Sequence, residues 1–351
     1  MWIVDKEVEE AETLSPRSEV VPTKKSKEKK KTYKGDRVDI NNEETMILGG
    51  YAALLIASAQ NILGYPTCNL ILLVHSFRVL FILSATPFCC DNNFINEETL
   101  LIETDVVAGK YPYWNRSLGA DHFMLACHDW GPEASFAVPH LHRNSIRVLC
   151  NANTSEGFDP SKDVSFPEVN LHTGAISGLI GRPSPHRSIL AFFAGGLHGP
   201  IRPILLQHWE NKDEDVKVHR YLPRGVSFYD MMRRSKFCIC PSGYEVASPR
   251  VVEAIYTGCV PVLISDHYVP PFSDVLNWRS FSVEVTVREI PNLKTILSSI
   301  SSRQYIRMQR RVAQVRRHFE VHSPPKRYDV FHMILHSVWL RRLNVGLSDN
   351  Q

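Results

Sequence analysis

Short apolar runs alternate with helical patterns through the C-terminal two thirds of the chain, and this alternation restricts the fold more than any other feature. Strands are predicted at residues 146–150, 188–194, 216–221, 237–240 and 260–265. Helices are predicted at residues 200–209, 227–235 and 248–256, and again near residues 293–300, 302–318 and 329–343. Ser227 is a suitable N-cap for the second helix, and Gly258 is a suitable stop after the third. Strands and helices that alternate at this spacing indicate parallel βαβ units, so we expect an α/β domain within residues 91–351.

The N-terminal part differs from the rest in composition. Residues 1–44 lack apolar periodicity, and the stretch from Lys24 to Arg37 holds eight Lys or Arg residues against two acids. This composition is typical of a solvated, disordered tail, and equally of a basic flank on the cytosolic side of a membrane segment. The 351-residue chain as a whole has a net charge of only +3, which gives no reason to expect a nucleic-acid partner.

Residues 45–90 carry a single fully charged side chain, Arg78. About 20 apolar residues are enough to cross a bilayer, and residues 46–63 and 70–88 are both candidates. An arginine in mid-span costs about 2.5–3.5 kcal/mol on insertion, which argues against the second. We expect one uncleaved signal anchor, with the basic tail in the cytosol and residues 91–351 in a lumen. A pair of buried core elements is the alternative.

In open α/β sheets, ligands bind beyond the carboxyl ends of the strands, so the residues that follow each predicted strand are candidates for a site. After the strand at residues 188–194 the chain continues as GGLHGPIR, which includes His198 and Arg202. Glycines expose backbone N–H groups, a helix start favours an anion, and the two side chains add positive charge. This loop suits a diphosphate, and an ordinary strand-to-helix turn is the alternative. It matches neither the P-loop nor the dinucleotide-binding motif.

After the strand at residues 237–240 the chain continues as PSGYEVASPRVVE. Arg250 and Glu253 are three residues apart and share one face of the predicted helix. A guanidinium binds phosphate oxygens bidentately, and a carboxylate can accept hydrogen bonds from two ribose hydroxyls. With Glu245 and Ser248 ahead of the helix, the segment outlines a nucleotide-sugar site. A surface Arg–Glu pair is the alternative.

Aromatic and acid–base residues gather upstream, in the stretches YPYWNR, GADH and HDWG between residues 111 and 131. His122, His128 and Asp129 are candidate general bases for a sugar hydroxyl, and aromatic rings suit the apolar faces of sugars. A structural loop is the alternative. The histidine spacing does not match a metal-binding helix, and no Asp-x-Asp element points to a divalent ion, so no metal site is expected.

Two sequons, at Asn115 and Asn153, agree with a lumenal glycoprotein. In a lumen some of the eight cysteines could pair, and Cys127 and Cys150 are candidates. Buried free thiols are the alternative, since connectivity cannot be read from a sequence.

From about Asp105 to Val345 the sequence resembles the plant exostosin-like glycosyltransferases, a branch of glycosyltransferase family 47. The matching stretches include CHDWGPEAS, LCNANTSEGFDPSKDVSFPE, AFFAGGLHGPIRP and KFCICPSGYEVASPRVVEAIYTGCVPVLISD. The resemblance implies a GT-B-like fold, in which two Rossmann-like domains face each other and the C-terminal one holds the donor. It further implies a single-pass type II Golgi membrane protein that transfers sugar from a UDP-sugar, with inversion, to a cell-wall polysaccharide of the pectin or hemicellulose type.

The resemblance also implies roles for the candidate residues. Arg250 would hold the diphosphate and Glu253 the ribose, while Glu245 would lie near the donor sugar. The complete set of implied donor-binding residues is His198, Arg202, Glu245, Ser248, Arg250 and Glu253. An inverting reaction needs one base on the acceptor side, and His122, His128 and Asp129 stay unranked for this role. No cofactor beyond the UDP-sugar is expected, so arginines and helix-start N–H groups would stabilise the departing diphosphate.

Upstream of about Asp105 the sequence does not match the family, whose members carry a fuller acceptor domain there. We therefore expect a charged tail at residues 1–44, a hydrophobic segment at 45–90, a partial or divergent acceptor-side domain at 91–180, and a complete donor domain with C-terminal helices at 181–345. The alternatives to an active enzyme are a non-catalytic donor-binding or scaffold subunit of a glycosyltransferase complex, and a truncated gene model.

Overall fold

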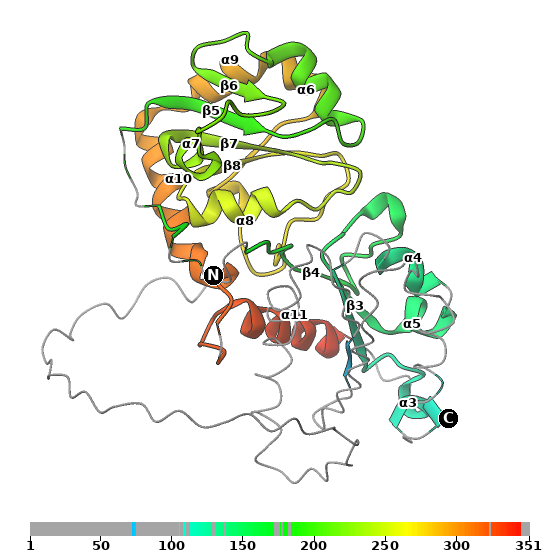
Figure 1. Ribbon diagram of the computed structural model, residues 1–351. Coiled ribbons are helices and arrows are strands. Elements are labelled where there is room, and N and C mark those ends of the chain that lie inside the picture. The colour runs from blue at the N-terminus through cyan, green and yellow to red at the C-terminus, as the bar shows by residue number, and fades with distance from the viewer. Residues whose placement is uncertain are drawn as a thin grey trace, which may run out of the picture. The chain divides into compact units, whose positions relative to one another are not determined.

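The computed structural model describes two α/β sheets with their helices (Figure 1). The described residues are 72–74, 105, 108–109, 113–127, 131–136, 138–171, 176, 178–181, 184, 186–322 and 324–344. The charged tail at residues 1–44 and the first apolar candidate at residues 46–63 lie outside them.

The larger sheet has five strands, all parallel, in the order β6-β5-β7-β8-β9. These strands are β5 (Ile189–Ala194), β6 (Val216–His219), β7 (Ser235–Pro241), β8 (Val260–Ile264) and β9 (Val283–Glu284). The connecting helices are α6 (Ile201–Trp209), α7 (Phe228–Arg234) and α8 (Pro249–Tyr256). The predicted parallel βαβ units are thus confirmed, with β7 beginning two residues earlier than its apolar run.

Local chemistry explains where the helices of this sheet begin and end. The Ser227 side chain caps α7 by accepting a hydrogen bond from the backbone N–H of Asp230. Gly258 follows α8 with a φ of +67°, a left-handed conformation that favours glycine. Both predictions from the sequence are confirmed.

Further helices, which follow the last strand of the larger sheet in the sequence, pack on this sheet. They are η3 (Val287–Asn292), α9 (Leu293–Ser299), α10 (Ser302–Val315) and η4 (Arg316–Phe319). Helix α10 packs on α8 and β8 through buried Tyr305, Met308 and Val312. The buried residues of these helices and of the strands form one hydrophobic cluster, so the larger sheet has a core of its own.

The smaller sheet has the order β1-β2-β3-β4, with β2, β3 and β4 parallel and β1 antiparallel to β2. Its strands are β1 (Leu72–Val74), β2 (Phe123–Ala126), β3 (Ile146–Leu149) and β4 (Val164–Ser165). The short helices beside them are α3 (Tyr113–Ser117), α4 (Gly131–Phe136), α5 (Pro139–Asn144) and η1 (Thr154–Glu156). Because β1 lies inside the apolar stretch at residues 70–88, that stretch contributes a strand to the sheet at these three residues.

Helix α11 (Val330–Asn344) returns from the end of the chain to the smaller sheet (Figure 1). Val330, Met333 and Ile334 share a hydrophobic cluster with strands β2, β3 and β4. The sequence grouped this helix with the donor domain, whereas it contacts β3 and β4 of the smaller sheet as well as η4. No helix within the described residues has both the length and the apolar character needed to span a membrane.

Within the described residues, two cysteine pairs form disulfide bonds, Cys127–Cys150 and Cys238–Cys259. The first joins the ends of the adjacent strands β2 and β3 and was the candidate pair from the sequence. The second joins β7 to the residue that precedes β8. Cys240 is a buried free thiol, so both behaviours that the sequence left open occur in this chain.

A segment after β8 connects the two sheets and thereby fixes the geometry of the site. Backbone hydrogen bonds run from Thr154 N to His267 O, from Val269 N to Ala152 O and from Phe272 N to Ser165 O, at 2.9–3.0 Å. Phe272 is fully buried in the hydrophobic cluster of the smaller sheet. The carboxyl end of β8 is therefore tied to the residues that follow β3 and β4.

Candidate functional site

The strand order of the larger sheet points to a ligand site. From β5 the chain moves outward to β6, and it then returns to place β7 on the other side of β5. A reversal of this kind is a topological switch point, where the loops after the two central strands diverge and leave a crevice for a ligand. Here those loops are residues 195–200 after β5 and 242–248 after β7.

The two loops approach each other closely at Gly199. A Cβ atom on this residue would lie 1.7 Å from the carbonyl oxygen of Gly243, and its φ is +67°. Only glycine fits both requirements. The glycine-rich character of the first loop is thus explained by its contact with the second.

Two arginines lie at this crevice, Arg202 in the first turn of α6 and Arg250 in the first turn of α8. Arg202 is 6% exposed. Arg250 donates a hydrogen bond from Nη2 to the carbonyl oxygen of Ala194 at 3.1 Å, and its guanidinium lies 5.4 Å from the centre of the Phe193 ring. Burial, followed by the positive charge of Arg250, lowers the pKa of Arg202 to about 10, with Glu168 opposing the shift.

The charge of this arginine pair is not neutralised by direct ion pairs. Neither Arg202 nor Arg250 forms a salt bridge with a carboxylate in the described part of the chain, and the buried Nε atom of each lacks a hydrogen-bond partner there. Two neighbouring cations with unsatisfied donors are costly when buried. An anion in the crevice would supply the missing acceptors.

Ser248 offers a third donor at the same place. It precedes α8 as the N-cap residue and is 4% exposed, yet its side chain makes no capping hydrogen bond. Its Oγ atom has no hydrogen-bond partner within the described residues. The free end of α8 and this hydroxyl both favour a negatively charged ligand.

Glu253 lies deeper in α8 and is 6% exposed. Its Oε1 atom accepts a hydrogen bond from the hydroxyl of Tyr229 at 3.1 Å. Burial and the adjacent carboxylate raise the pKa of Tyr229, so this hydroxyl stays protonated as a donor. The ion pairs found within the described residues do not include one between Arg250 and Glu253, the surface pair that was the alternative from the sequence.

Glu245 is held from the smaller sheet by Asn151, a residue that the sequence reasoning missed. The Asn151 Nδ2 atom donates to Oε2 of Glu245 and, at 3.3 Å, to Oε2 of Glu156. Its Oδ1 atom accepts from the backbone N–H of Val246 at 3.3 Å. Asn151 follows β3 and is 2% exposed. The rule that ligands bind beyond the carboxyl ends of parallel strands, which led to the residues after β5 and β7, would also have identified Asn151 after β3.

His198 and two tyrosines form an exposed aromatic surface beside the arginines. The rings of His198 and Tyr244 are stacked, with centres 5.4 Å apart and planes at 21°. Tyr244 is 77% exposed and Tyr221, at the end of β6, is 79% exposed. Such large exposed aromatic side chains are typical of surfaces that contact a flat ring or a sugar face.

The three candidate bases differ in their placement. His128 and Asp129, which follow β2 in the sequence, lie outside the described residues. His122 precedes β2, so it lies at the opposite end of that strand, and it is 2% exposed. Its Nδ1 atom is 2.9 Å from Oδ1 of Asp121. His122 is thus placed at the edge of the smaller sheet opposite to the carboxyl ends of β2 and β3, and its role as a base stays a prediction.

The two sequons also differ. Asn115 is exposed on α3. Asn153 is 7% exposed, and its Oδ1 atom caps η1 by accepting hydrogen bonds from the N–H and the hydroxyl of Ser155. Asn153 thus has a structural role that explains its place in the sequence without a glycan, and Asn115 is the accessible sequon.

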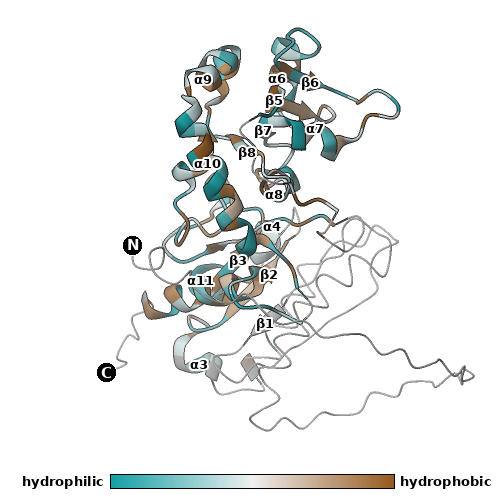
Figure 2. Ribbon diagram, turned by 90° about the vertical axis from the view of Figure 1, so that its left-hand side faces the viewer, coloured by the Kyte–Doolittle hydropathy of each residue, from teal (hydrophilic) through white to brown (hydrophobic). Residues whose placement is uncertain are grey.

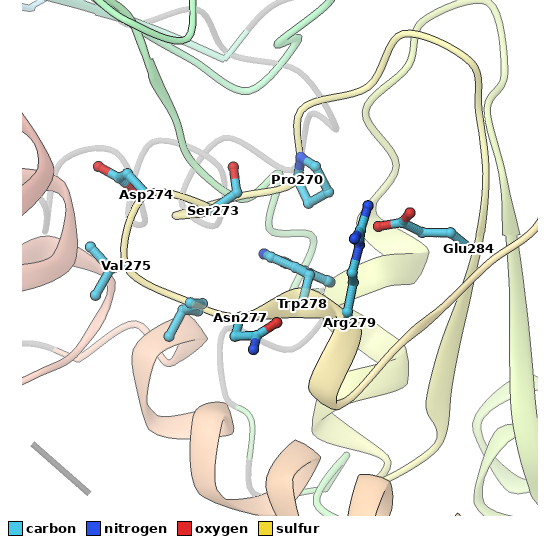
Figure 3. Close-up of a pocket in the computed structure, with 9 residues that line it drawn as sticks. Pro270, Ser273, Asp274, Val275, Asn277, Trp278, Arg279 and Glu284 are labelled. Carbon is cyan, nitrogen blue, oxygen red and sulfur yellow. The ribbon is translucent and has the colours of Figure 1, made fainter. Parts of the chain in front are cut away.

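Metal-binding groups and cavities elsewhere in the described residues also bear on the site. No group of three or more His, Cys, Asp or Glu side chains that could hold a metal ion is found among them. A cavity of about 430 Å³ is lined by residues from Pro270 to Glu284, among them Trp278 and Arg279 (Figure 3). None of the predicted site residues lines this cavity.

Comparison of the sequence with known proteins identifies the family of this chain. Residues 83–300 match the exostosin GT47 domain. The chain is 75% identical over 246 residues to a probable glycosyltransferase of Arabidopsis thaliana, and the match covers 70% of this chain and 48% of the relative. It is 32% identical over 255 residues to a probable glucuronosyltransferase of Oryza sativa subsp. japonica, covering 66% of this chain and 59% of the relative.

A probable β-1,4-xylosyltransferase of Arabidopsis thaliana is 28% identical over 292 residues, covering 78% of this chain and 67% of the relative. The chain spans about half the length of the Arabidopsis relatives that it matches at 54–75% identity. The mixed α/β structure with parallel sheets is consistent with a GT-B-like glycosyltransferase fold. The chain belongs to the exostosin GT47 family.

Proposed function

We propose that this protein is an inverting glycosyltransferase that moves a sugar from a UDP-sugar to a growing cell-wall polysaccharide in the Golgi, without a metal ion. Family membership supports transfer from a nucleotide sugar, and the relatives named as xylosyltransferase and glucuronosyltransferase support a polysaccharide product. A non-catalytic donor-binding subunit is the second candidate.

The observation that carries the proposal is the arginine pair at the switch point. Arg202 and Arg250 converge with unsatisfied Nε donors, and the unpaired hydroxyl of Ser248 lies at the start of α8. A diphosphate brings several acceptor oxygens and two negative charges, which would satisfy these groups together. Positive charge placed in this way also stabilises the diphosphate as it leaves, which is the task that a metal performs in other transferases.

The remaining residues receive roles from their positions around the pair. Glu253, held by Tyr229, would accept hydrogen bonds from the ribose, and Glu245, held by Asn151, would lie near the donor sugar. The stacked rings of His198 and Tyr244 would line the mouth of the crevice. The base that deprotonates the acceptor would come from His128 or Asp129, because both follow the carboxyl end of β2.

A lumenal location agrees with the cysteine chemistry. Disulfide bonds persist in oxidising compartments and are rare in the cytosol, and the described part of the chain holds Cys127–Cys150 and Cys238–Cys259. The exposed sequon at Asn115 points the same way. An anchor within residues 46–63, flanked by the basic tail, would make the protein a single-pass type II protein of the Golgi membrane.

The test is UDP binding by the full chain and by the variant Arg250→Ala. Loss of a charged hydrogen bond costs about 1.5–3 kcal/mol, so the affinity for UDP should fall about 10- to 100-fold. Arg288→Ala is the matched control, because Arg288 is an exposed arginine in η3 on another part of the domain. Equal affinity in wild type and Arg250→Ala would refute the assignment of the donor site.

Two further measurements separate the parts of the proposal. Binding of UDP that survives a chelator supports a metal-independent site, and binding that the chelator abolishes contradicts this part. Release of UDP in the presence of a UDP-sugar and polysaccharide fragments distinguishes an enzyme from a donor-binding subunit, which would bind UDP without transfer.

A further inference from the structure

Helix α10 presents a face of arginines that the proposed function does not use. Its exposed side chains are all polar: Ser302, Arg303, Gln304, Arg307, Arg310, Arg311 and Gln314. Helix α10 contains no acidic residue. We call Arg303, Arg307, Arg310 and Arg311 the arginine face.

The geometry of the helix makes this face continuous. With 3.6 residues per turn, the four arginines fall within an arc of about 100°. The buried residues Tyr305, Met308 and Val312 lie on the opposite side, packed on the larger sheet. The 14 residues of α10 extend over about 21 Å. Figure 2 shows the strongly hydrophilic residues along this helix.

The charge of the arginine face is free to act outside the molecule. None of the four arginines forms an ion pair with a carboxylate in the part of the chain that the structure describes. Arg311 donates one hydrogen bond, from Nη1 to the carbonyl oxygen of Ser280 at 3.2 Å. Neighbouring like charges on a helix repel one another by a few tenths of a kcal/mol per pair, and a polyanion would relieve that repulsion.

Three observations select the kind of polyanion. The exposed cations of α10 are all arginines, whose planar fork matches a carboxylate bidentately. Its exposed side chains include no apolar group that could enter a bilayer, as the helices that lie on membranes require. The two disulfides agree with a secretory compartment, where nucleic acid is not an available partner.

We propose that the arginine face of α10 is a secondary binding site, outside the catalytic crevice, for a carboxylate-bearing polysaccharide such as a chain of uronic acids. The choice of a polysaccharide rests on the proposed function, while the surface itself is independent of the donor site. Carboxylates spaced regularly along the chain pair with arginines on successive turns of α10. The site retains the polymer near the enzyme between rounds of transfer.

The test is the affinity of the full chain for polygalacturonate fragments, measured by biolayer interferometry at low and at high salt. The variant replaces three arginines together, Arg303→Gln, Arg307→Gln and Arg310→Gln. The matched control removes the same charge from exposed arginines on three other elements, Arg143→Gln, Arg234→Gln and Arg288→Gln. The loss of three exposed charge pairs should lower the affinity by about 3- to 150-fold, and we expect this loss in the α10 variant alone.

Fully methyl-esterified fragments provide the second control, because esterification removes the carboxylate charge. The proposal is supported if polygalacturonate binds and if this binding is lost in three cases: after esterification, at high salt and in the α10 variant. It is overturned if polygalacturonate does not bind, if both triple variants lose affinity equally, or if esterified chains bind as well. Stronger binding, through the same arginines, to anionic lipid vesicles or to RNA also overturns it.

A thermal-shift assay with UDP on the same preparations keeps the two proposals apart. If UDP stabilises the protein while polygalacturonate fails to bind, the secondary site is wrong and the donor site stands. If polygalacturonate binds through α10 while UDP has no effect, the donor site fails and the secondary site stands.

Discussion

Replacing Asn151 by Asp tests whether this side chain holds the site together. The substitution keeps the size of the residue but turns the Nδ2 donor into a carboxylate oxygen. That oxygen would face Oε2 of Glu245 and Oε2 of Glu156, the two atoms to which Asn151 now donates. Asn151 is 2% exposed, so the new charge has little access to water.

The magnitude follows from two effects. A lost hydrogen bond to a charged acceptor costs about 1.5–3 kcal/mol. Two carboxylates about 4 Å apart repel by about 4 kcal/mol at an effective dielectric constant of about 20. Glu245 is only half-buried and Glu156 is exposed, so solvent screens much of this repulsion. We expect Asn151→Asp to lower the free energy of unfolding by about 3 kcal/mol at neutral pH.

The effect should depend on pH, with a sign that the structure fixes. Repulsion raises the pKa of the new carboxyl group in the folded state above its value in the unfolded chain. The folded protein then binds the proton more tightly, so its stability is recovered as pH falls towards about 4 and lost as pH rises. Asn151→Leu loses the two hydrogen bonds from Nδ2, and also the one that Oδ1 accepts from Val246 N–H, but adds no charge, so its destabilisation should not grow with pH.

The assay is urea unfolding of wild type and both variants at about pH 5 and about pH 8, with UDP affinity measured alongside. Asn151→Asp should lose more stability at the higher pH, relative to Asn151→Leu, and its affinity for a UDP-sugar should fall more than its affinity for UDP. Equal pH dependence in the two variants would refute the reasoning, because the carboxylate would then not face Glu245.

Three further predictions concern other parts of the fold. The pKa of His142 is lowered by burial and by Arg147, whose Nη1 atom lies 2.9 Å from the His142 Nδ1 atom. The unfolded chain therefore binds this proton more tightly, and the free energy of unfolding should decline as pH falls through about 6.5. Urea unfolding of His142→Gln should show a smaller decline. The double variant Cys238→Ser, Cys259→Ser lacks the second disulfide, so its free energy of unfolding should fall by about 2–5 kcal/mol and a reductant should no longer act at this position. Cys240→Ser removes only a free thiol, so the response of the protein to reductant should stay unchanged. Gly199→Ala should weaken UDP binding and lower Tm by several degrees, because its Cβ collides with Gly243 O; wild-type values would contradict the close approach of the two loops.

Much of the larger sheet follows from the sequence because its signals are local. β5 and β8 are short, fully apolar runs bounded by loops, and each is followed or preceded by a helix with a recognisable start or stop. The rule that ligands bind beyond the carboxyl ends of strands then located Arg202, Ser248 and Arg250, which the structure brings to one crevice. For these residues, position along the chain and position in space are closely related.

The remaining features depend on contacts between distant segments. Asn151 and Glu245 are 94 residues apart, and no local pattern connects them. Helix α11 is apolar enough to pack on either sheet, and only the tertiary structure assigns it to β3 and β4. His122 was a candidate by residue type alone, while its place at the start of β2 depends on strand direction. The second disulfide was one of many pairings among eight cysteines.

The most direct test of the account is a crystal structure of the full chain with UDP. We expect phosphate oxygens within hydrogen-bond distance of Nε of both Arg202 and Arg250 and of Oγ of Ser248, with the uridine beside Glu253. UDP bound elsewhere, or bound at the switch point without contact to either arginine, would contradict the central claim that this pair forms the donor site.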